Sequence, residues 1–243
     1  MCCRVSKENT DKHVLLQNYK GQKIDWDDFF AKTDELRNIQ KRGSTVPCCE
    51  GCMYLEKNKW EDSHYIETIN INNWIKCNAD CIYCDRHEHK GEKEYNIYPI
   101  IKDLISKNLL KKKADITIAG GEPTITSDFD KTLKILIKND ISTVRVLTNA
   151  IKYNRHIEKG LKLGLVNILI STDSGTAKTY KTIKKVDKHK EAWKNIQKYA
   201  KNQQIDSLVK TKYIIIPGIN DSKEEIYEFI KQNSLADVKY ACI

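Results

Sequence analysis

The sequence has no hydrophobic run long enough to cross a membrane. Its 243 residues are 40% hydrophobic, which is enough for one substantial core with a small appendage. No apolar stretch approaches the ~20 residues that a membrane-spanning helix needs. No secretory signal precedes the cysteines, so we expect a reducing, cytoplasmic environment without disulfides and no membrane partner.

Arginine is scarce, although the chain is basic. Only six of the 42 basic residues are arginine, and the formal net charge is +9. The lysines are scattered over the predicted helix faces, with one run at residues 111–113. Because bidentate recognition of phosphates and bases favours arginine, this composition argues against a nucleic-acid partner.

Internal repeats are absent, apart from an alternation of β-like and helical segments. The β-like runs are residues 66–71, 115–119, 143–147, 165–170 and 212–216, followed by a last one near 240–243. Helical spacing of apolar residues follows them, at Ile97, Ile100, Ile101, Leu104 and Ile105, at Phe129, Leu133, Leu136 and Ile137, at Ile196 and Tyr199, and at Ile226, Phe229 and Ile230. This alternation predicts an α/β fold with a parallel sheet of about six strands and right-handed crossovers. In such folds ligands gather at the C-terminal ends of the strands.

Three closely spaced cysteines lie shortly after the first β-like run. Cys77, Cys81 and Cys84 are separated by three and then two residues. Three thiolates on one short loop can hold three corners of a [4Fe–4S] cube and leave the fourth iron without a protein ligand. An iron left open can bind a small molecule, which favours an enzyme site over a simple electron carrier.

Zinc is an alternative for the same loop. The three cysteines with either His87 or His89 would form a Cys₃His site at similar spacings. Buried thiols without a metal are a third interpretation. The spacing of the cysteines does not by itself decide among these alternatives.

A glycine-rich strand end follows further along the chain. The run 115–119 leads into Gly120-Gly121-Glu122-Pro123-Thr124. Two glycines allow the backbone to approach a ligand closely, and a glutamate can accept a hydrogen bond from an ammonium group. Alone, the pattern is also typical of an ordinary turn before a helix. With the cysteine loop, however, the chain resembles the radical S-adenosylmethionine (SAM) superfamily. In that family a CxxxCxxC loop holds the cluster and a GGEP strand end binds the methionine amino group of SAM.

The resemblance continues at later strand ends, over roughly residues 66–241. Thr148-Asn149-Ala150 is similar to the TNG that ends the third strand in many relatives, and residues 171–175 to the SLDG that ends the fourth. A fifth end at residues 217–221 is similar to one that lies along adenine. The resemblance implies an open (β/α)₆ barrel, a partial TIM-like barrel. The implied SAM contacts are Tyr83, Gly120, Gly121, Glu122, Pro123, Thr148, Asn149, Ser171, Asp173, Ile216, Pro217 and Gly218.

Individual roles follow from the same resemblance. Glu122 would orient the methionine ammonium of SAM, and Ser171 and Asp173 would approach its carboxylate and ribose. Tyr83 occupies the place of an aromatic residue near the adenine. Each of these strand ends also reads as a polar loop before a helix cap, so they count mainly through their common order along the chain.

Residues 1–65 precede the predicted core domain, residues 66–243. A helical pattern begins near Asp25 and runs to about Gln40, with acidic residues in its first turn as the helix dipole prefers. The cysteines of this segment are Cys2, Cys3, Cys48, Cys49 and Cys52. The segment resembles, more weakly, the SPASM or twitch cassettes that hold an auxiliary iron–sulfur cluster, although it would here precede the barrel. A zinc site and thiols that bind nothing are the alternatives.

The chain ends within the last β-like run. We expect Cys242 to be a buried strand thiol rather than a ligand. Because an exposed edge strand is a liability, we expect an unusually minimal barrel, a shortened chain, or an edge that is closed by another device.

The resemblance implies an enzyme that reductively cleaves SAM at a [4Fe–4S] cluster. The 5′-deoxyadenosyl radical that results abstracts hydrogen from a substrate, and a flavodoxin or ferredoxin would supply the electron. A peptide or protein substrate is the leading interpretation, because SPASM-type cassettes often accompany such substrates. Carbohydrate or nucleotide-sugar tailoring is the second. A zinc-stabilised binding module is the alternative from another class, but it would have no use for residues 120–123. No catalytic acid or base is assigned.

Overall fold

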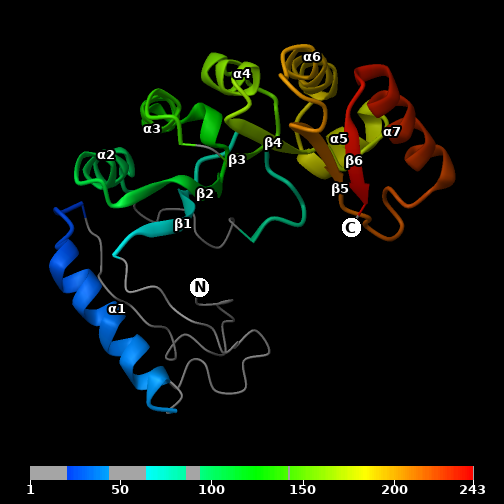
Figure 1. The fold of residues 1–243 in the computed structure, drawn as a ribbon. Coiled ribbons are helices and arrows are strands. Elements are labelled where there is room, and N and C mark those ends of the chain that lie inside the picture. Colours follow the sequence, from blue (N-terminus) through cyan, green and yellow to red (C-terminus); the bar gives the residue numbers. More distant parts are fainter. Residues whose placement is uncertain (1–20, 44–63, 86–93, 142, 243) are drawn as a thin grey trace. The chain divides into compact units, whose positions relative to one another are not determined.

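The computed structural model describes residues 21–43, 64–85, 94–141 and 143–242 (Figure 1). The chain divides into two compact units, residues 1–64 and residues 65–243. Among the described residues, no helix is both long enough and apolar enough to cross a membrane.

The first unit contains helix α1 (Trp26–Lys41). Asp25 caps its N-terminus, where the carboxylate accepts hydrogen bonds from Asp27 N and Asp28 N at 3.1 Å. This is the helix that the sequence predicts from its acidic first turn. The five cysteines of the predicted auxiliary site lie outside the described residues, so that site stays a prediction.

The second unit is built on a parallel sheet (Figure 1). Its strands are β1 (Ile66–Trp74), β2 (Leu110–Gly120), β3 (Val144–Thr148), β4 (Val166–Ser171), β5 (Val209–Tyr213) and β6 (Lys239–Cys242). In the described part of the chain the six strands lie in the order β1-β2-β3-β4-β5-β6, and every neighbouring pair is parallel. Sequential order in a parallel sheet is the arrangement of a partial (β/α) barrel, as predicted.

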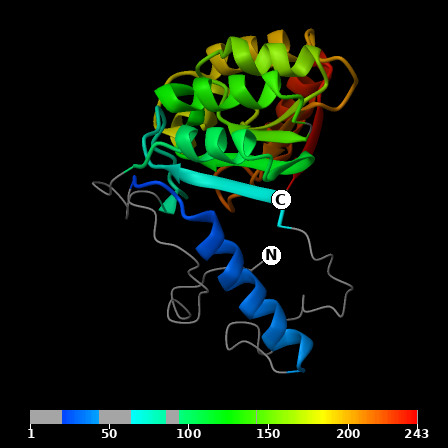
Figure 2. The same cartoon turned by 60° about the vertical axis from the view of Figure 1, so that its left-hand side comes forward.

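Helices connect the strands and cover the outer face of the sheet. They are α2 (Tyr98–Ser106), α3 (Ser127–Lys138), α4 (Arg155–Lys162), α5 (Ala177–Lys184), α6 (His189–Ala200) and α7 (Lys223–Ala236), with a short 3₁₀ turn η4 (Pro123–Ile125). Figures 1 and 2 show α2, α3, α4 and α6 following one another along the curved sheet. The predicted stripe of α3 is buried, with Phe129, Leu133 and Leu136 at 0% exposed. The stripes of α2 and α7 are buried only in part, because Ile97, Ile100, Ile105, Ile226 and Ile230 are half-buried.

Alternation along the strands separates the core from the other face. In β2, Ile116 and Ile118 are fully buried, and in β4 the buried positions are Val166, Ile168 and Ile170. Between these positions lie half-buried residues, because successive side chains point to opposite faces of a sheet. The sheet therefore packs one face against the helices and leaves its C-terminal strand ends to build a site.

Strand β5 starts and ends three residues before the predicted run 212–216. It pairs with β4 from Val209, which lies opposite Ile168. The apolar residues after Tyr213 form a loop instead, in which Ile214 N donates to Asp173 Oδ1 at 2.9 Å and Ile216 N donates to Asn220 Oδ1 at 2.6 Å. Side chains have replaced the strand partners of these amides, so the prediction for the end of this strand was wrong.

The prediction that Cys242 is buried was also wrong. All four residues of β6 are exposed, Cys242 among them. The strand pairs with β5 through Tyr213 and Cys242 and ends the described order of the sheet. An edge strand presents one side to its neighbour and the other to solvent, and this position explains the exposure.

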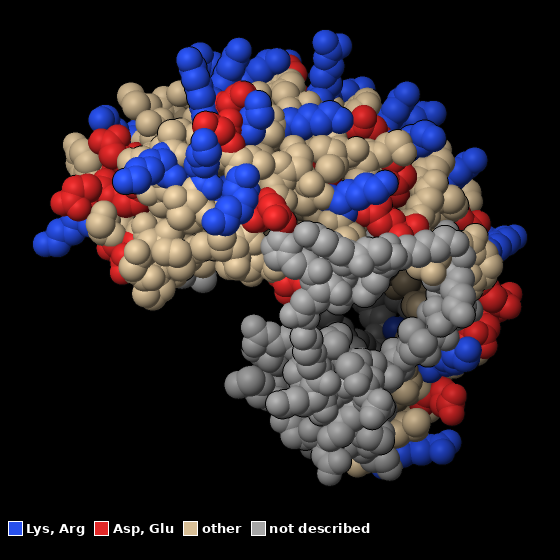
Figure 3. Space-filling view, turned by 180° about the vertical axis from the view of Figure 1, so that it is seen from behind, with Lys and Arg blue, Asp and Glu red and all other residues tan. Residues whose placement is uncertain are grey.

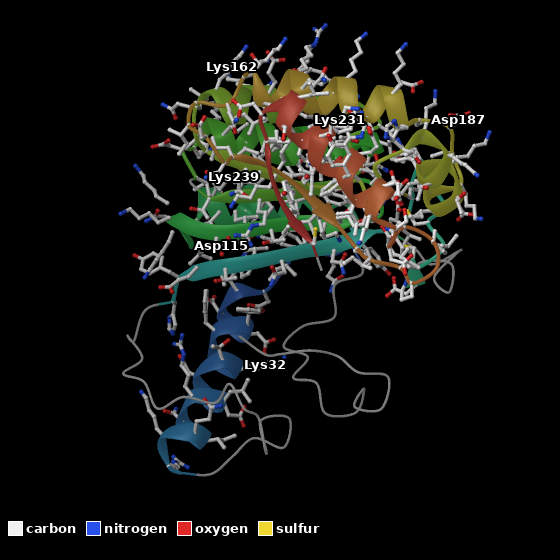
Figure 4. All side chains as sticks on the ribbon, turned by 90° about the vertical axis from the view of Figure 1, so that its right-hand side faces the viewer. Lys32, Asp115, Lys162, Asp187, Lys231 and Lys239 are labelled. Atoms are coloured by element: carbon white, nitrogen blue, oxygen red, sulfur yellow. The ribbon has the colours of Figure 1, made fainter. Side chains whose placement is uncertain are left out.

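Basic side chains of the described residues are dispersed over one face of the molecule rather than gathered in one patch (Figure 3). On the face that Figure 3 shows, Lys and Arg are interspersed with Asp and Glu. Lys162 of α4 and Lys231 of α7 extend outward from their helices (Figure 4), and each pairs with a glutamate of its own helix. Ion pairs within one helix are typical of a solvated face, as the sequence indicated.

Candidate functional site

The cysteine loop leaves the sheet at the C-terminal end of β1. Ile75 N and Lys76 N both donate to Glu94 Oε1 at 2.7 Å, which fixes the entrance to the loop. Cys77 is exposed as a residue, and Cys81 is half-buried. Burial of the sulfur still raises the pKa of Cys77, and the charges of Glu122, Cys81 and Cys84 raise it further.

The carboxylate of Glu122 joins the ends of β2 and β3. Glu122 is 1% exposed, and its Oε1 accepts from Thr124 N at 3.2 Å, Thr124 Oγ1 at 2.5 Å and Thr148 Oγ1 at 2.7 Å. Its Oε2 accepts from Asn149 N at 2.7 Å. Burial raises the pKa of Glu122, while these hydrogen bonds oppose the increase. The side chain that the resemblance assigns to SAM thus also organises its own strand ends.

The two glycines before Glu122 allow a close approach within the protein. A Cβ on Gly121 would lie 2.1 Å from Lys76 O, and one on Gly120 would lie 2.9 Å from Trp74 O. Gly120 also has a φ of +120°, which favours glycine. The strand end 120–122 is hydrogen-bonded to the start of the cysteine loop, through Gly121 N to Trp74 O at 2.6 Å and Glu122 N to Lys76 O at 2.8 Å.

Asn149 connects this region to the cysteines. Its Nδ2 donates to Asn78 Oδ1 at 2.7 Å and lies 3.8 Å from the sulfur of Cys77. The backbone N–H of Asn149 also donates the hydrogen bond that Oε2 of Glu122 accepts. The end of β3 therefore holds the first part of the cysteine loop, Cys77 and Asn78, which we call its first arm.

Asp173, which follows β4, holds the second arm of the cysteine loop, residues 80–84. It is fully buried with a φ of +55°, a left-handed conformation that Asp tolerates better than most residues. Its Oδ2 accepts from Tyr83 OH at 2.5 Å and from Lys184 Nζ at 2.5 Å, and its Oδ1 accepts from Ile214 N at 2.9 Å. Ser171, the other predicted residue here, ends β4 and is half-buried.

The predicted adenine-side loop reaches the same cluster of groups. Asn220 Nδ2 donates to Asp173 O at 2.8 Å, and Asn220 Oδ1 accepts from Ile216 N. Pro217 and Gly218 are exposed beside them, and Gly218 has a φ of +76°. Residues 216–218 are thus connected to the end of β4 through Asn220.

Lys184 and Glu94 were not predicted from the sequence. Glu94 lies in a polar stretch without a motif. Lys184 is 1% exposed at the end of α5, in line with Tyr180 and next to Ile183, both of which are fully buried. A lysine four residues after a buried aromatic on a short helix is the signal that would have found it.

The donor set suits an iron–sulfur cube better than one metal ion. Among the described residues, no group of three or more His, Cys, Asp or Glu is placed to hold a single metal ion. A cube needs less convergence, because each thiolate binds its own iron. His87 and His89, the candidate fourth ligands of a zinc site, lie outside the described residues.

One tyrosine of α5 combines full burial with a hydroxyl that is unsatisfied among the described residues. Tyr180 is 0% exposed, and its OH has no hydrogen-bond partner within the described ranges. Burial raises the pKa of Tyr180, and the charges of Cys81, Glu122 and Asp173 raise it further. A buried polar atom without a partner costs stability unless a ligand or water satisfies it.

Comparisons with known proteins agree with this geometry. A model of the Radical SAM superfamily matches residues 74–230. The GTP 3′,8-cyclase of Clostridium botulinum is 32% identical over 169 residues, which are 68% of this chain and 52% of that protein. The crystal structure of Streptococcus suis SuiB bound to S-adenosylmethionine has a TM-score of 0.59 at 13% identity, over 89% of this chain and 45% of SuiB.

A second relative extends the match beyond bacteria. The probable GTP 3′,8-cyclase of Methanocaldococcus jannaschii is 30% identical over 123 residues, 49% of this chain and 41% of that protein. The chain spans about half the length of the curated relatives it matches. The family model covers more than half of the chain, and the likeness to SuiB concerns the fold alone. The chain belongs to the radical SAM superfamily, a family of enzymes whose cofactors are a [4Fe–4S] cluster and SAM.

Proposed function

We propose that this chain holds a [4Fe–4S] cluster through Cys77, Cys81 and Cys84 and uses it to cleave SAM. When bound and reduced, these cofactors supply a 5′-deoxyadenosyl radical that abstracts hydrogen from a substrate. The observation that carries the proposal is the anchoring of one three-cysteine loop to three consecutive strand ends, through the backbone N–H of Glu122 and the side chains of Asn149 and Asp173.

The protein's part is to position the cofactors. Among the described residues, Oε2 of Glu122 accepts one hydrogen bond, from Asn149 N, and a carboxylate oxygen can accept about two. This oxygen has capacity for the ammonium of SAM, as the resemblance implies. Asp173 has both oxygens engaged by protein donors, which favours a supporting role over direct contact with the ribose.

A nucleotide is the substrate class that we favour. The relative with 32% identity is named for a reaction on GTP. The net charge of +9 suits a polyanionic ligand, although the described basic side chains are dispersed. A peptide is the second candidate, because the cysteine-containing segment before residue 65 is similar to cassettes that accompany peptide substrates. We assign any second cluster or zinc to the cysteines of that segment, and an acidic flavodoxin or ferredoxin would donate the electron.

The test is substrate-dependent cleavage of SAM. Reconstituted full-length protein with SAM and dithionite should form 5′-deoxyadenosine, and GTP should increase the amount more than ATP, a peptide mixture or a nucleotide sugar does. Deuterium transfer from labelled GTP into 5′-deoxyadenosine would establish hydrogen abstraction. Cleavage that GTP leaves unchanged, with stimulation by a peptide, would reject the nucleotide and retain the radical chemistry.

A further inference from the structure

The second arm of the cysteine loop is tied to the last turn of α5. Asp80 N donates to Lys184 O at 3.0 Å, and Ile82 N donates to Ile183 O at 3.0 Å. Cys81 lies between these two donors in the sequence. The backbone on both sides of Cys81 therefore takes its position from the end of this helix.

Three side chains form a second tie at the same place. Lys184 Nζ lies 2.5 Å from Asp173 Oδ2, and the two side chains are 1% and 0% exposed. Tyr83 OH donates to the same oxygen at 2.5 Å and accepts from Lys184 Nζ at 2.8 Å. The ammonium also lies 5.3 Å from the centre of the Tyr83 ring. We call Tyr83, Asp173 and Lys184 the loop clamp.

The energetics of the clamp indicate a role beyond stability. Burying two charges costs several kcal/mol per ion, and a well-packed apolar pair is often as stable or more stable. A buried ion pair is therefore weak evidence for stabilisation alone. The partner that this pair gains is Tyr83, which lies between two of the three cysteines in the sequence.

The two arms of the loop use different anchors. The first arm, at Cys77 and Asn78, is held by Asn149 from the end of β3. The second arm depends on α5 and on the clamp, since its hydrogen bonds run to Ile183, Lys184 and Asp173. Loss of the clamp should therefore loosen the second arm and leave the first in place.

We propose that Lys184 is a positioning residue that, through Asp173 and Tyr83, holds the second arm of the cysteine loop in the conformation that receives the cluster. This inference rests on the proposed function only in its statement that the loop receives a [4Fe–4S] cluster. The constraint on the arm itself is present without any cofactor. Because the second arm carries Cys81 and Cys84, the clamp preorganises two of the three thiolates. Cluster assembly should therefore be faster than in a chain without the clamp.

The decisive variant is Tyr83→Phe, which keeps the ring and the buried ion pair but removes the hydroxyl that connects them to the loop. Its matched control is Tyr153→Phe, which removes a hydroxyl bonded to Glu158 at 2.7 Å, away from the loop. Hydrogen exchange of full-length, metal-free protein should be measured at the amides of Asp80 and Ile82. We expect exchange about tenfold faster in Tyr83→Phe, as loss of a hydrogen bond to a charged group predicts. The control should match the wild type.

A second set of variants addresses Lys184 directly. Lys184→Met leaves Asp173 buried without its cation and therefore carries a risk of unfolding. The double variant Asp173→Asn/Lys184→Met removes both charges at similar volume, and Lys181→Met on the exposed side of the same helix is its control. We expect the double variant to show faster exchange at Asp80 and Ile82 and slower assembly of the cluster, with the amide of Asn149 unaffected.

The outcomes separate this inference from the proposed function. Wild-type exchange and assembly rates in both Tyr83→Phe and the double variant would overturn the positioning role. If the wild-type protein binds zinc and no iron, the proposed function is rejected. If hydrogen exchange at Asp80 and Ile82 is nevertheless faster in Tyr83→Phe than in the wild type, the constraint on the loop is kept. Uniform acceleration of exchange over the whole sheet would assign the clamp to general stability and also overturn the inference.

Discussion

At the scale of single residues, Glu122 is bound by several protein donors. Its two oxygens accept four hydrogen bonds from Thr124, Thr148 and Asn149. The sequence predicts a contact with the ammonium of SAM, and the structure adds a connection between the ends of β2 and β3. The two roles are compatible, because the carboxylate is positioned by the donors that satisfy it.

This connection predicts a loss of stability in Glu122→Ala. The change leaves buried donors of Thr124, Thr148 and Asn149 without an acceptor, and we expect a loss of about 2–4 kcal/mol in the free energy of unfolding. Glu122→Gln keeps one accepting oxygen and should lose less. Urea unfolding of the metal-free protein measures both. Equal stability of Glu122→Ala and the wild type would show that these hydrogen bonds contribute nothing.

Cys81 gives the residue-scale test of the metal site. Cys81→Ala removes one of the three proposed ligands, and we expect it to abolish the cluster-dependent visible absorbance after reconstitution. Cys242→Ala is a suitable control, because Cys242 is exposed on β6. Unchanged iron and sulfide in Cys81→Ala would exclude Cys81 as a ligand.

At the scale of elements, the end of β2 is shaped by its contact with the start of the cysteine loop. A Cβ on Gly121 would lie 2.1 Å from Lys76 O, whereas a Cβ on Gly218 meets nothing within 4 Å. Gly218 has a φ of +76°, so its substitution carries backbone strain alone. The two glycines therefore separate steric from conformational effects.

Replacing Gly121 or Gly218 by alanine should cause different losses of stability. Gly121→Ala must displace backbone atoms, and we expect it to cost about 3 kcal/mol or more. Gly218→Ala should cost about 1 kcal/mol, the penalty of the left-handed conformation. Thermal unfolding of both variants provides the comparison. A smaller loss in Gly121→Ala than in Gly218→Ala would contradict the close approach of β2 to Lys76.

Helix α6 contributes a dependence of stability on pH. Burial lowers the pKa of His189, and a hydrogen bond to the backbone of Gly175 and the charge of Glu225 partly offset this effect. The unfolded chain therefore binds the proton at a higher pH than the folded chain does, and stability falls as the pH decreases below about 6.5. His189→Gln should reduce this fall between pH 7.5 and pH 5.5, as measured by thermal unfolding. An identical fall in the variant would exclude His189 as its source.

The sequence predicts helices and strands correctly where the local pattern of residues determines their bounds. It fails where side chains distant in the sequence determine where a strand ends. The apolar periodicity predicts α3 and a parallel sheet of about six strands, because burial on one face imposes that periodicity. It misplaced β5, since Asp173 and Asn220 take up the amides of Ile214 and Ile216. The cysteine spacing points to the loop. The spacing of Lys184 from Tyr180 could indicate that Lys184 is buried, but its role depends on Tyr83, which lies 101 positions away in the sequence.

At the scale of the whole molecule, the second unit contains the strand ends at which the sequence predicts the SAM contacts. The family model spans residues 74–230, within that unit. Both SAM cleavage and its substrate are therefore proposals for this chain, which spans about half the length of the curated relatives it matches. The cysteines before residue 65 remain a prediction for a second metal site.

The most direct test of the account is the iron and acid-labile sulfide content of the anaerobically reconstituted full-length protein. We predict about four irons and four sulfides per chain from the loop cysteines, and about eight of each if the N-terminal cysteines also hold a cluster. The triple variant Cys77→Ala/Cys81→Ala/Cys84→Ala should lose the first four in either case. One zinc per chain with no iron, or full iron retention in the triple variant, would contradict the proposed centre.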